Sequence, residues 1–435
     1  MTDLERAGHV VKSLPEGGLF AGMTWRTAAH PFSLGPRLAA EIESLGRVFY
    51  QFYKAVNQLY RRSVEGGAPA WFAGLLDQGK PAELVALQRE SAFRNELPRV
   101  LRPDILLTED GFIVSELDSI PGGIGLTQWL NQTYAELGDN VLGGANGMQD
   151  GFASIFGGAK RVHLVISEEA SSYRPEMAWL AGRLGAERFK IQEGGFESPD
   201  RGDAIYRFFE LFDLAHVPSS TSLFRLALEK QISLTPPPRP IFEEKLLFAL
   251  FWNRHLRDLW RQELGDTFYR RLQQILPRSW ILDPTPLPPN AGYPGLELTD
   301  WTQLKSLSQR ERNFILKISG FSPQAWGSRG VYLGSDLSTV DWSKAVDRAL
   351  GAWPDSPYIL QQFHKPRRFE SSFIEVNTST EVPMPARVRL CPYYFAAGNS
   401  DIARSKLGGI LATLNPVDKK IIHGMTDAIL VPCTA

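Results

Sequence analysis

The chain has 435 residues, of which 43% are hydrophobic and 22% charged, a balance typical of an ordinary globular protein with two or three domains. The 47 basic and 48 acidic side chains leave a net charge of -1, so composition does not predict binding to nucleic acid or to a membrane. The two cysteines exclude a disulfide framework, and the N-terminal segment lacks the apolar core of a secretion signal. We therefore expect a cytoplasmic protein.

The first half of the chain predicts helices followed by strands. Residues 36–64 place hydrophobic side chains at three- and four-residue spacing, and residues 71–97 continue this helical pattern with a break at 79–81. A glycine-rich stretch at 121–125 precedes a further helical segment. Residues 161–235 combine short apolar strands with a helix, which predicts a small α/β unit.

The proline-rich segment 235–240 predicts a stiff linker and marks the clearest domain boundary. A helix is expected over 242–262, and strands then alternate with glycine loops at 314–318, 358–363 and 386–395. The predicted fold class is therefore α/β (α+β). Its expected parts are a mainly helical region (1–100), a hairpin with a glycine-rich loop (101–155), the small α/β domain (156–235) and a larger strand-rich region (240–435).

Four charged residues flank the turn at 109–111 of a predicted β-hairpin. If this turn is a three-residue loop with Gly111 in the left-handed region, Asp104 lies opposite Glu116 and Arg102 lies opposite Asp118. Paired residues, and residues two apart on one strand, share a face of the sheet, so all four would project from the same side.

Three carboxylates on one face predict a Mg²⁺ site, because Mg²⁺ prefers oxygen ligands and binds through a few carboxylates together with substrate phosphates. The alternative is a solvated hairpin face on which Arg102 neutralises two of the acids. A two-residue turn at 110–111 would instead shift the pairing by one residue and place Asp104 on the opposite face.

Lysines and a glycine loop in the C-terminal region suggest a phosphate site. Lys317 lies within an apolar strand, where an ammonium group needs a partner. The loop that follows, made of Gly327, Ser328, Arg329 and Gly330, could close over phosphates through its backbone N–H groups. The alternative is an edge-strand lysine followed by an ordinary turn, since the loop matches no common phosphate-binding pattern.

Three further polar residues are candidates for the same site. Lys245 opens a helix and either contacts a ligand or is solvated, and Gln361 and Gln362 could read the edge of a base or satisfy backbone groups. The seven histidines are scattered, which does not favour zinc. Cys391 is expected to be buried rather than reactive.

Taken in chain order, these motifs resemble the synthetase domain of glutathionylspermidine synthase, a circularly permuted ATP-grasp ligase. The resemblance covers the chain from about residue 95 to its end. Its motifs are Arg102-Pro-Asp104, Glu116-Leu-Asp118 with the loop 119–123, Glu244-Lys245-Leu246-Leu247, Lys317 to Gly330, and Ile359-Leu-Gln-Gln362.

The resemblance implies an ATP-dependent ligase that joins a small-molecule or peptide carboxylate to an amine through an acyl phosphate. Asp104, Glu116 and Asp118 would hold Mg²⁺, and Arg102 would stabilise the transferring phosphoryl group. ATP would be bound by Lys245, Lys317, the loop 327–330, and Gln361 or Gln362.

This chain departs from the family pattern at several positions. Asp118 stands where the family has asparagine, the glycine loop is longer, and the late glycine pair Gly408-Gly409 is followed by no arginine. The first hundred residues contain no cysteine, so we expect this segment not to be a cysteine-dependent amidase domain. Two other functions therefore stay open: a nucleotide-binding regulatory or scaffold subunit, and a kinase that stops after phosphoryl transfer.

Overall fold

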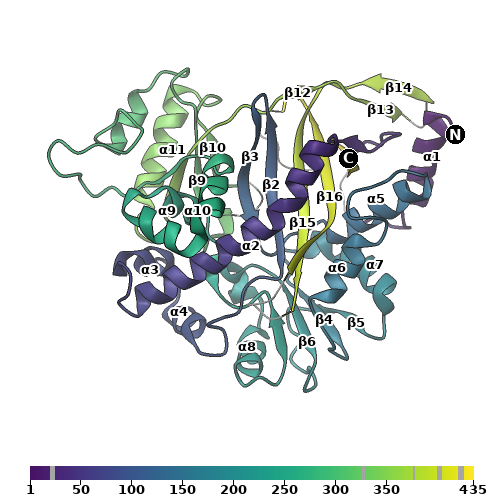
Figure 1. Cartoon of the computed structure of the whole chain (residues 1–435), viewed down its shortest axis with the longest axis horizontal. Helices are drawn as coiled ribbons and strands as arrows, with labels where there is room; N and C mark the ends of the chain where they lie inside the picture. The colour runs from purple at the N-terminus through teal and green to yellow at the C-terminus, as the bar shows by residue number, and fades with distance from the viewer. Residues whose placement is uncertain (20–24, 326, 328, 376–377, 399–403, 420–425) are drawn as a thin grey trace. The chain divides into compact units, whose positions relative to one another are not determined.

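A computed structural model describes residues 1–19, 25–325, 327, 329–375, 378–398, 404–419 and 426–435 (Figure 1). The chain forms two compact units, each built from separated segments. Unit 1 contains residues 1–50, 90–238 and 366–435, and unit 2 contains residues 51–89 and 239–365. Among the described residues, no helix has both the length and the apolar character that a membrane span requires.

The core of unit 1 is a large sheet that is antiparallel except at one edge (Figure 1). Its strand order is β1-β17-β16-β15-β2-β3, with β12 also pairing with β15. The bounds are β1 (Phe32–Ser33), β2 (Val100–Thr108), β3 (Gly111–Asp118), β12 (Arg368–Phe369), β15 (Ala386–Ala397), β16 (Arg404–Pro416) and β17 (Ile429–Thr434). The short strands β13 (Ser372–Glu375) and β14 (Thr380–Pro383) form a separate hairpin.

Several helices belong wholly or partly to unit 1. The bounds are α1 (Asp3–Ser13), α2 (Pro36–Val64, whose first half belongs to unit 1), α5 (Ile124–Glu136), α6 (Gly147–Ser154) and α7 (Arg174–Gly185). The apolar face of α2 packs on Tyr394, whose hydroxyl donates to the Ile42 carbonyl at 2.5 Å. Helices α5 and α6 contact β16, and α6 also contacts β15. The apolar side chains of α2, α5 and α6 pack with those of the large sheet to form the hydrophobic core of unit 1.

A second, fully parallel sheet completes unit 1. Its order is β5-β4-β6-β7, with β4 (Val162–Ile166), β5 (Phe189–Glu193), β6 (Ala204–Phe208) and β7 (Ser233–Thr235), and α8 (Ser220–Leu228) precedes its last strand. Every residue of β4 and β6 is buried, as expected for parallel strands covered on both faces. The predicted α/β unit at 161–235 is therefore present.

Unit 2 is built around a four-stranded antiparallel sheet of order β10-β9-β11-β8. The strands are β8 (Ser279–Ile281), β9 (Phe314–Ile318), β10 (Val331–Leu333) and β11 (Tyr358–Gln362). The helices are the second half of α2, α3 (Ala70–Asp77), α4 (Ala82–Arg89), α9 (Leu246–Trp252), α10 (Arg257–Ile275) and α11 (Thr339–Gly351). Trp342 of α11 is completely buried against Leu316 and Leu360 on one face of this sheet.

Several predicted elements change in detail. The helix expected over 71–97 ends at Arg89, and the helix expected over 242–262 is divided because the Asn253 side chain caps a new turn. The segment 235–240 does mark the boundary between units, but its residues 236–240 are buried rather than exposed as a linker would be. The units also group the chain differently from the four linear ranges, since residues 366–435 belong with the hairpin of unit 1.

Candidate functional site

The hairpin of β2 and β3 has the predicted pairing, but it reaches that pairing in a different way. Thr108 pairs with Gly111, so the turn contains only residues 109–110 and not the three expected residues. A register shift beside Asp104 makes Ser115 an extra residue in β3, and its hydroxyl donates to the Asp104 carbonyl at 3.3 Å. This β-bulge restores the register that a three-residue turn would have produced.

Beyond the bulge, Arg102 lies opposite Asp118 and Asp104 lies opposite Glu116, as predicted. The guanidinium of Arg102 confirms that the side chains share a face, because its Nη2 lies 3.2 Å from Asp104 Oδ1 and 3.1 Å from Asp118 Oδ2. The four residues Arg102, Asp104, Glu116 and Asp118, here called the acidic hairpin, therefore form one charged surface within unit 1.

Asp104 is the most enclosed carboxylate of the acidic hairpin, with 3% of its surface exposed. Besides Arg102, it accepts a hydrogen bond from Arg389 Nη1 at 3.2 Å and one from Cys391 Sγ at 3.5 Å, both on β15. Burial, together with the nearby Asp104 charge, raises the pKa of Cys391 to about 12, so this thiol stays protonated and unreactive, as expected. The sequence did not indicate Arg389 as part of this site.

Asp118 and Glu116 are less enclosed than Asp104. Burial raises the pKa of Asp118, and the neighbouring Glu116 and Asp104 carboxylates add to this shift, although Arg102 and the Ile120 backbone N–H oppose it. Within the described ranges, no three acidic, histidine or cysteine side chains are arranged so that they alone could hold a metal ion. The predicted Mg²⁺ site is therefore not preformed by these side chains.

The loop after β3 is held by a buried carboxylate. Glu176 of α7 accepts hydrogen bonds from the backbone N–H groups of Gly123 (2.6 Å) and Leu126 (2.8 Å) at the start of α5. Burial raises the pKa of Glu176 to about 7 despite these bonds. Gly123 has φ 89°, and a Cβ atom at this position would come within 2.4 Å of the Tyr393 hydroxyl, so only glycine fits here.

Unit 2 contains a second group of charged residues, here called the lysine cluster: Lys80, Lys245, Lys317 and Glu244. Lys80 Nζ lies 2.5 Å from Glu244 Oε1, and the two side chains are 1% and 2% exposed. The Ser319 hydroxyl donates to the other Glu244 oxygen and accepts the Leu246 N–H at 2.8 Å. Lys80 was not predicted as part of this site. Its ion pair with Glu244, together with the Ser319 hydrogen bonds, holds the residues next to Lys245 and Lys317 in place.

The predicted nucleotide residues of unit 2 divide between the faces of its sheet. Lys317 is 7% exposed and pairs with Ile359, two residues from Gln361, so Lys317 and Gln361 share a face. Gln361 is buried and donates to the Ser279 hydroxyl at 3.4 Å, whereas Gln362 is exposed and points to the other side. Of the two glutamines, Gln361 is thus the one placed with Lys317.

The glycine loop begins close to Lys245, whose Nζ donates to the Ala325 carbonyl at 2.9 Å. Gly327 has φ 63°, Arg329 is exposed, and the Gly330 N–H donates to the Gln324 carbonyl at 2.8 Å. Ser328 lies outside the described residues. The start of the glycine loop therefore lies beside Lys245 of the lysine cluster.

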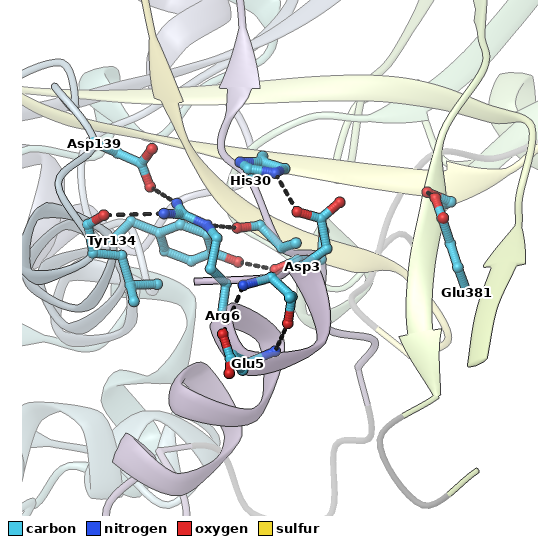
Figure 2. Close-up of polar contacts among 12 residues, drawn as sticks. Asp3, Glu5, Arg6, His30, Tyr134, Asp139 and Glu381 are labelled. Atoms are coloured by element: carbon cyan, nitrogen blue, oxygen red, sulfur yellow. Dashed lines mark hydrogen bonds and ion pairs between the residues drawn. The ribbon is translucent and has the colours of Figure 1, made fainter. Parts of the chain in front are cut away.

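Unit 1 also has a cavity of about 250 Å³ beside α1, near the contacts drawn in Figure 2. Arg6 ties α1 to the residues before β1 and after α5 by pairing with Asp139 and donating to the Ala29 carbonyl. The cavity is lined by acidic side chains that include Asp3, which pairs with His30 at 3.0 Å. Of the residues described in the structure, none that the sequence predicts for the site lines this cavity.

Comparisons with known proteins support the fold. No protein-family model matches the chain, and no curated protein matches it. Among solved structures, it is similar to a glutathione synthetase-like effector from Globodera pallida in its apo form, with a TM-score of 0.59 and 12% identity. That similarity covers 99% of this chain and 96% of the other.

A second solved structure, assigned as a gamma-glutamylcysteine synthetase from Methylobacillus flagellatus KT, shows a weaker likeness. It covers 92% of this chain and 89% of the other at 11% identity, but its TM-score of 0.39 carries no argument. The chain therefore has a mixed α/β fold of the glutathione synthetase-like type. The specific resemblance to glutathionylspermidine synthase stays a prediction from the sequence motifs.

Proposed function

We propose that this chain is an ATP- and Mg²⁺-dependent ligase that joins a carboxylate to an amine through an acyl phosphate. The observation that carries the proposal is the acidic hairpin, in which one arginine lies between two carboxylates on a single sheet face. This arrangement brings together Arg102-Pro-Asp104 and Glu116-Leu-Asp118, two of the motifs on which the sequence resemblance rests, in a chain with a glutathione synthetase-like fold.

The proposed roles follow from charge and burial. Arg102 offers several N–H donors in a planar fork, which suits the oxygens of a phosphoryl group in transfer. Lys245 and Lys317 would hold ATP phosphates. Lys317 is buried and Lys245 is partly buried, and ammonium groups shielded from water favour anionic partners.

The acidic hairpin fits Mg²⁺ in its chemistry. Asp104, Glu116 and Asp118 supply hard oxygen donors on one face. Burial raises the pKa of Asp118, and the nearby Glu116 and Asp104 charges add to the shift, so a cation placed beside them would favour the ionised carboxylates. Mg²⁺ is commonly bound by one or two carboxylates together with substrate phosphates, so a site completed by ATP agrees with the absence of a preformed one among the described side chains. When bound, the ion would neutralise charge on the phosphates.

The proposed chemistry has two balanced steps. An oxygen of the substrate carboxylate attacks the γ-phosphorus of ATP, the bond to the β-phosphate oxygen breaks, and ADP leaves. The amine nitrogen then attacks the acyl carbon, the bond to phosphate breaks, and a proton is released as the amide forms. Positioning and charge stabilisation dominate such transfers, which suits a site made of arginine, lysine and carboxylates.

The first test is the melting temperature of the protein with and without millimolar Mg-ATP. We expect an increase, because a ligand that binds only the folded state stabilises it by mass action. Glu116→Gln should reduce this increase without changing the melting temperature of the protein alone. An unchanged melting curve in Mg-ATP would refute the nucleotide proposal, and unfolding of the Glu116→Gln variant would assign the acidic hairpin a structural role.

The second test is ADP release with a panel of carboxylates and amines. Release that depends on both substrates supports the ligase. Phosphorylation of a carboxylate without an amine requirement would indicate a kinase, and nucleotide binding without turnover would indicate a regulatory or scaffold subunit.

A further inference from the structure

The cavity of about 250 Å³ beside α1, here called the α1 cavity, lies within unit 1 and is bounded by segments that are far apart in the sequence. Its floor comes from the large sheet, and its walls come from the start of α1, residues 28–31 and the hairpin of β13 and β14. The Ile374 N–H donates to the Thr27 carbonyl at 2.9 Å, and Arg6 donates to the Ala29 carbonyl at 2.9 Å. These bonds join the walls to one another, so the fold itself maintains the cavity.

The floor of the α1 cavity lies on the face of the large sheet opposite to the acidic hairpin. Leu414 of β16 lines the cavity, and its neighbour Thr413 pairs with Arg389, which lies 3.2 Å from Asp104. Because successive residues of a strand point to opposite faces, Leu414 projects away from the acidic hairpin. Ile429 of β17 pairs with Leu414 and also lines the cavity. The sheet therefore separates a molecule in this cavity from the proposed reaction site.

The floor of the cavity is apolar, whereas its walls carry acidic groups. The buried apolar side chains of the floor include Leu414, Ile429 and Val431. Three exposed carboxylates line the same cavity from separate segments of the chain, namely Asp3, Glu370 and Glu381 (Figure 2). Among the described residues of the lining, none is a lysine or an arginine. The lining therefore combines an apolar surface with an excess of negative charge.

Two arginines in the neighbourhood have other partners for their charge. Arg6 is paired with Asp139, which does not line the cavity. The guanidinium of Arg26 lies over the Phe373 ring, 4.4 Å from its centroid. Phe373 points to the opposite face of its hairpin from Ile374, and Ile374 lines the cavity. The charge of Arg26 is therefore on the far side of that hairpin from the cavity.

The N-terminus of α1 does not attract an anion to the cavity. The Thr2 hydroxyl accepts the Glu5 N–H at 3.3 Å, and the Glu5 carboxylate accepts the Thr2 N–H at 2.7 Å, so a capping box already engages this end of the helix. Asp3 and Glu5 in the first turn also offset the positive end of the helix dipole. The charge of the cavity thus favours a cation.

Size and polarity narrow the ligand further. A cavity of ~150 Å³ holds a benzene ring, so about 250 Å³ is enough for a ring with a short side chain. The apolar floor favours such a body because burying it removes apolar surface from water. An ammonium group at the end of the side chain matches the carboxylates of the walls, which an anion or a bare metal ion would not do together with the floor.

We propose that the α1 cavity is a second binding site of unit 1, which takes a small molecule with one ammonium group on an apolar body. The ammonium group binds among the carboxylates of Asp3, Glu370 and Glu381, and the apolar body packs on Leu414 and Ile429. This site does not depend on the proposed ligase function. Because the sheet lies between it and the acidic hairpin, its ligand is distinct from an amine that reacts there.

The test is isothermal titration calorimetry of the full chain with 2-phenylethylamine as the probe. The comparison compounds are 2-phenylethanol, which has a neutral end, and 3-phenylpropionate, which has an anionic end. We expect the amine to bind, added salt to weaken its binding, and both comparison compounds to bind at least ~5-fold more weakly. The double variant Glu370→Gln, Glu381→Gln should weaken binding of the amine by a similar ~5-fold factor.

Two controls locate the bound amine. Glu375→Gln removes an exposed carboxylate of β13 that does not line the cavity, so this variant should bind the amine as the natural protein does. Glu116→Gln should also keep this affinity, because Glu116 belongs to the acidic hairpin on the other face of the sheet. Residues 370, 375 and 381 are exposed, so these glutamine variants should keep the melting temperature of the natural protein.

The proposal is overturned if the amine does not bind or if the alcohol binds as tightly. It is also overturned if the double variant retains full affinity, or if Glu375→Gln or Glu116→Gln weakens binding as much as the double variant does. Its failure differs from that of the ligase proposal. A melting-temperature increase in Mg-ATP without amine binding leaves only the ligase proposal standing, and amine binding without that increase leaves only the cavity proposal standing.

Discussion

The pair of Lys80 and Glu244 offers the sharpest prediction on the stability of unit 2. The two charges are 2.5 Å apart and their side chains are 1% and 2% exposed, so water screens neither of them. Lys80→Met keeps most of the side-chain volume but removes the positive charge beside the buried Glu244 carboxylate, to which the Ser319 hydroxyl still donates. Breaking a buried pair in this way costs ~3–5 kcal/mol.

A double-mutant cycle isolates the interaction. Replacing Glu244 by Gln in the Lys80→Met background removes the uncompensated charge while keeping an oxygen for Ser319, so the double variant should be more stable than Lys80→Met by ~2 kcal/mol or more. The measurement is the free energy of unfolding from urea titration of the natural protein, both single variants and the double variant, followed by tryptophan fluorescence.

The exposed pair of Lys344 and Asp341 on α11 is the matched control in the same unit. These side chains are 73% and 59% exposed and their charged atoms are 4.0 Å apart, so Lys344→Met should change the free energy of unfolding by less than ~0.5 kcal/mol. If Lys80→Met costs no more than this control, or if the effects at Lys80 and Glu244 are additive, the argument from burial is wrong.

Three further predictions concern the site itself. Because burial raises the pKa of Glu176 from 4.5 to about 7, the folded chain holds an extra proton between these values; stability should therefore fall as pH rises from about 5 to about 7, and Glu176→Gln should remove this slope in urea titrations. Arg102→Ala should lower kcat by on the order of 10³-fold with little effect on ATP affinity, whereas Lys317→Ala should mainly weaken ATP binding, as ADP-release kinetics and direct ATP titration will show. Gly123→Ala should destabilise the fold by ~1–3 kcal/mol, since it strains a φ of 89° and brings Cβ within 2.4 Å of the Tyr393 hydroxyl; an unchanged urea midpoint would contradict this.

The face that the side chains of the acidic hairpin occupy could be predicted from the sequence, but the turn and the bulge that set their register could not. Alternation along the strands correctly placed Arg102, Asp104 and Asp118 on one face, because the side-chain period of a strand is fixed by its pleat. The turn was wrong by one residue, and the bulge at Ser115 restored the pairing. No glycine or proline marks Ser115 as a bulge, so local sequence rules had no signal for it.

The residues that the sequence did not predict for the site are mainly those that contact it from distant parts of the chain. Arg389 is 285 residues from Asp104 in the sequence, and Lys80 comes from a loop between α3 and α4 that no phosphate-binding motif includes. Helical and strand periodicities describe which face a residue occupies, but they do not state which distant strand lies beside it.

The surroundings of the three carboxylates separate their proposed roles. Asp104 is nearly enclosed and already has two arginine partners, so its charge is largely balanced within the protein. Glu116 and Asp118 are more exposed, and mutual repulsion contributes to the raised pKa of Asp118. A cation that binds together with a nucleotide would be stabilised most by Glu116 and Asp118, the two less enclosed carboxylates. Asp104 would then act chiefly by holding Arg102 and Arg389 in place, so that the Arg102 guanidinium is positioned for the phosphoryl group.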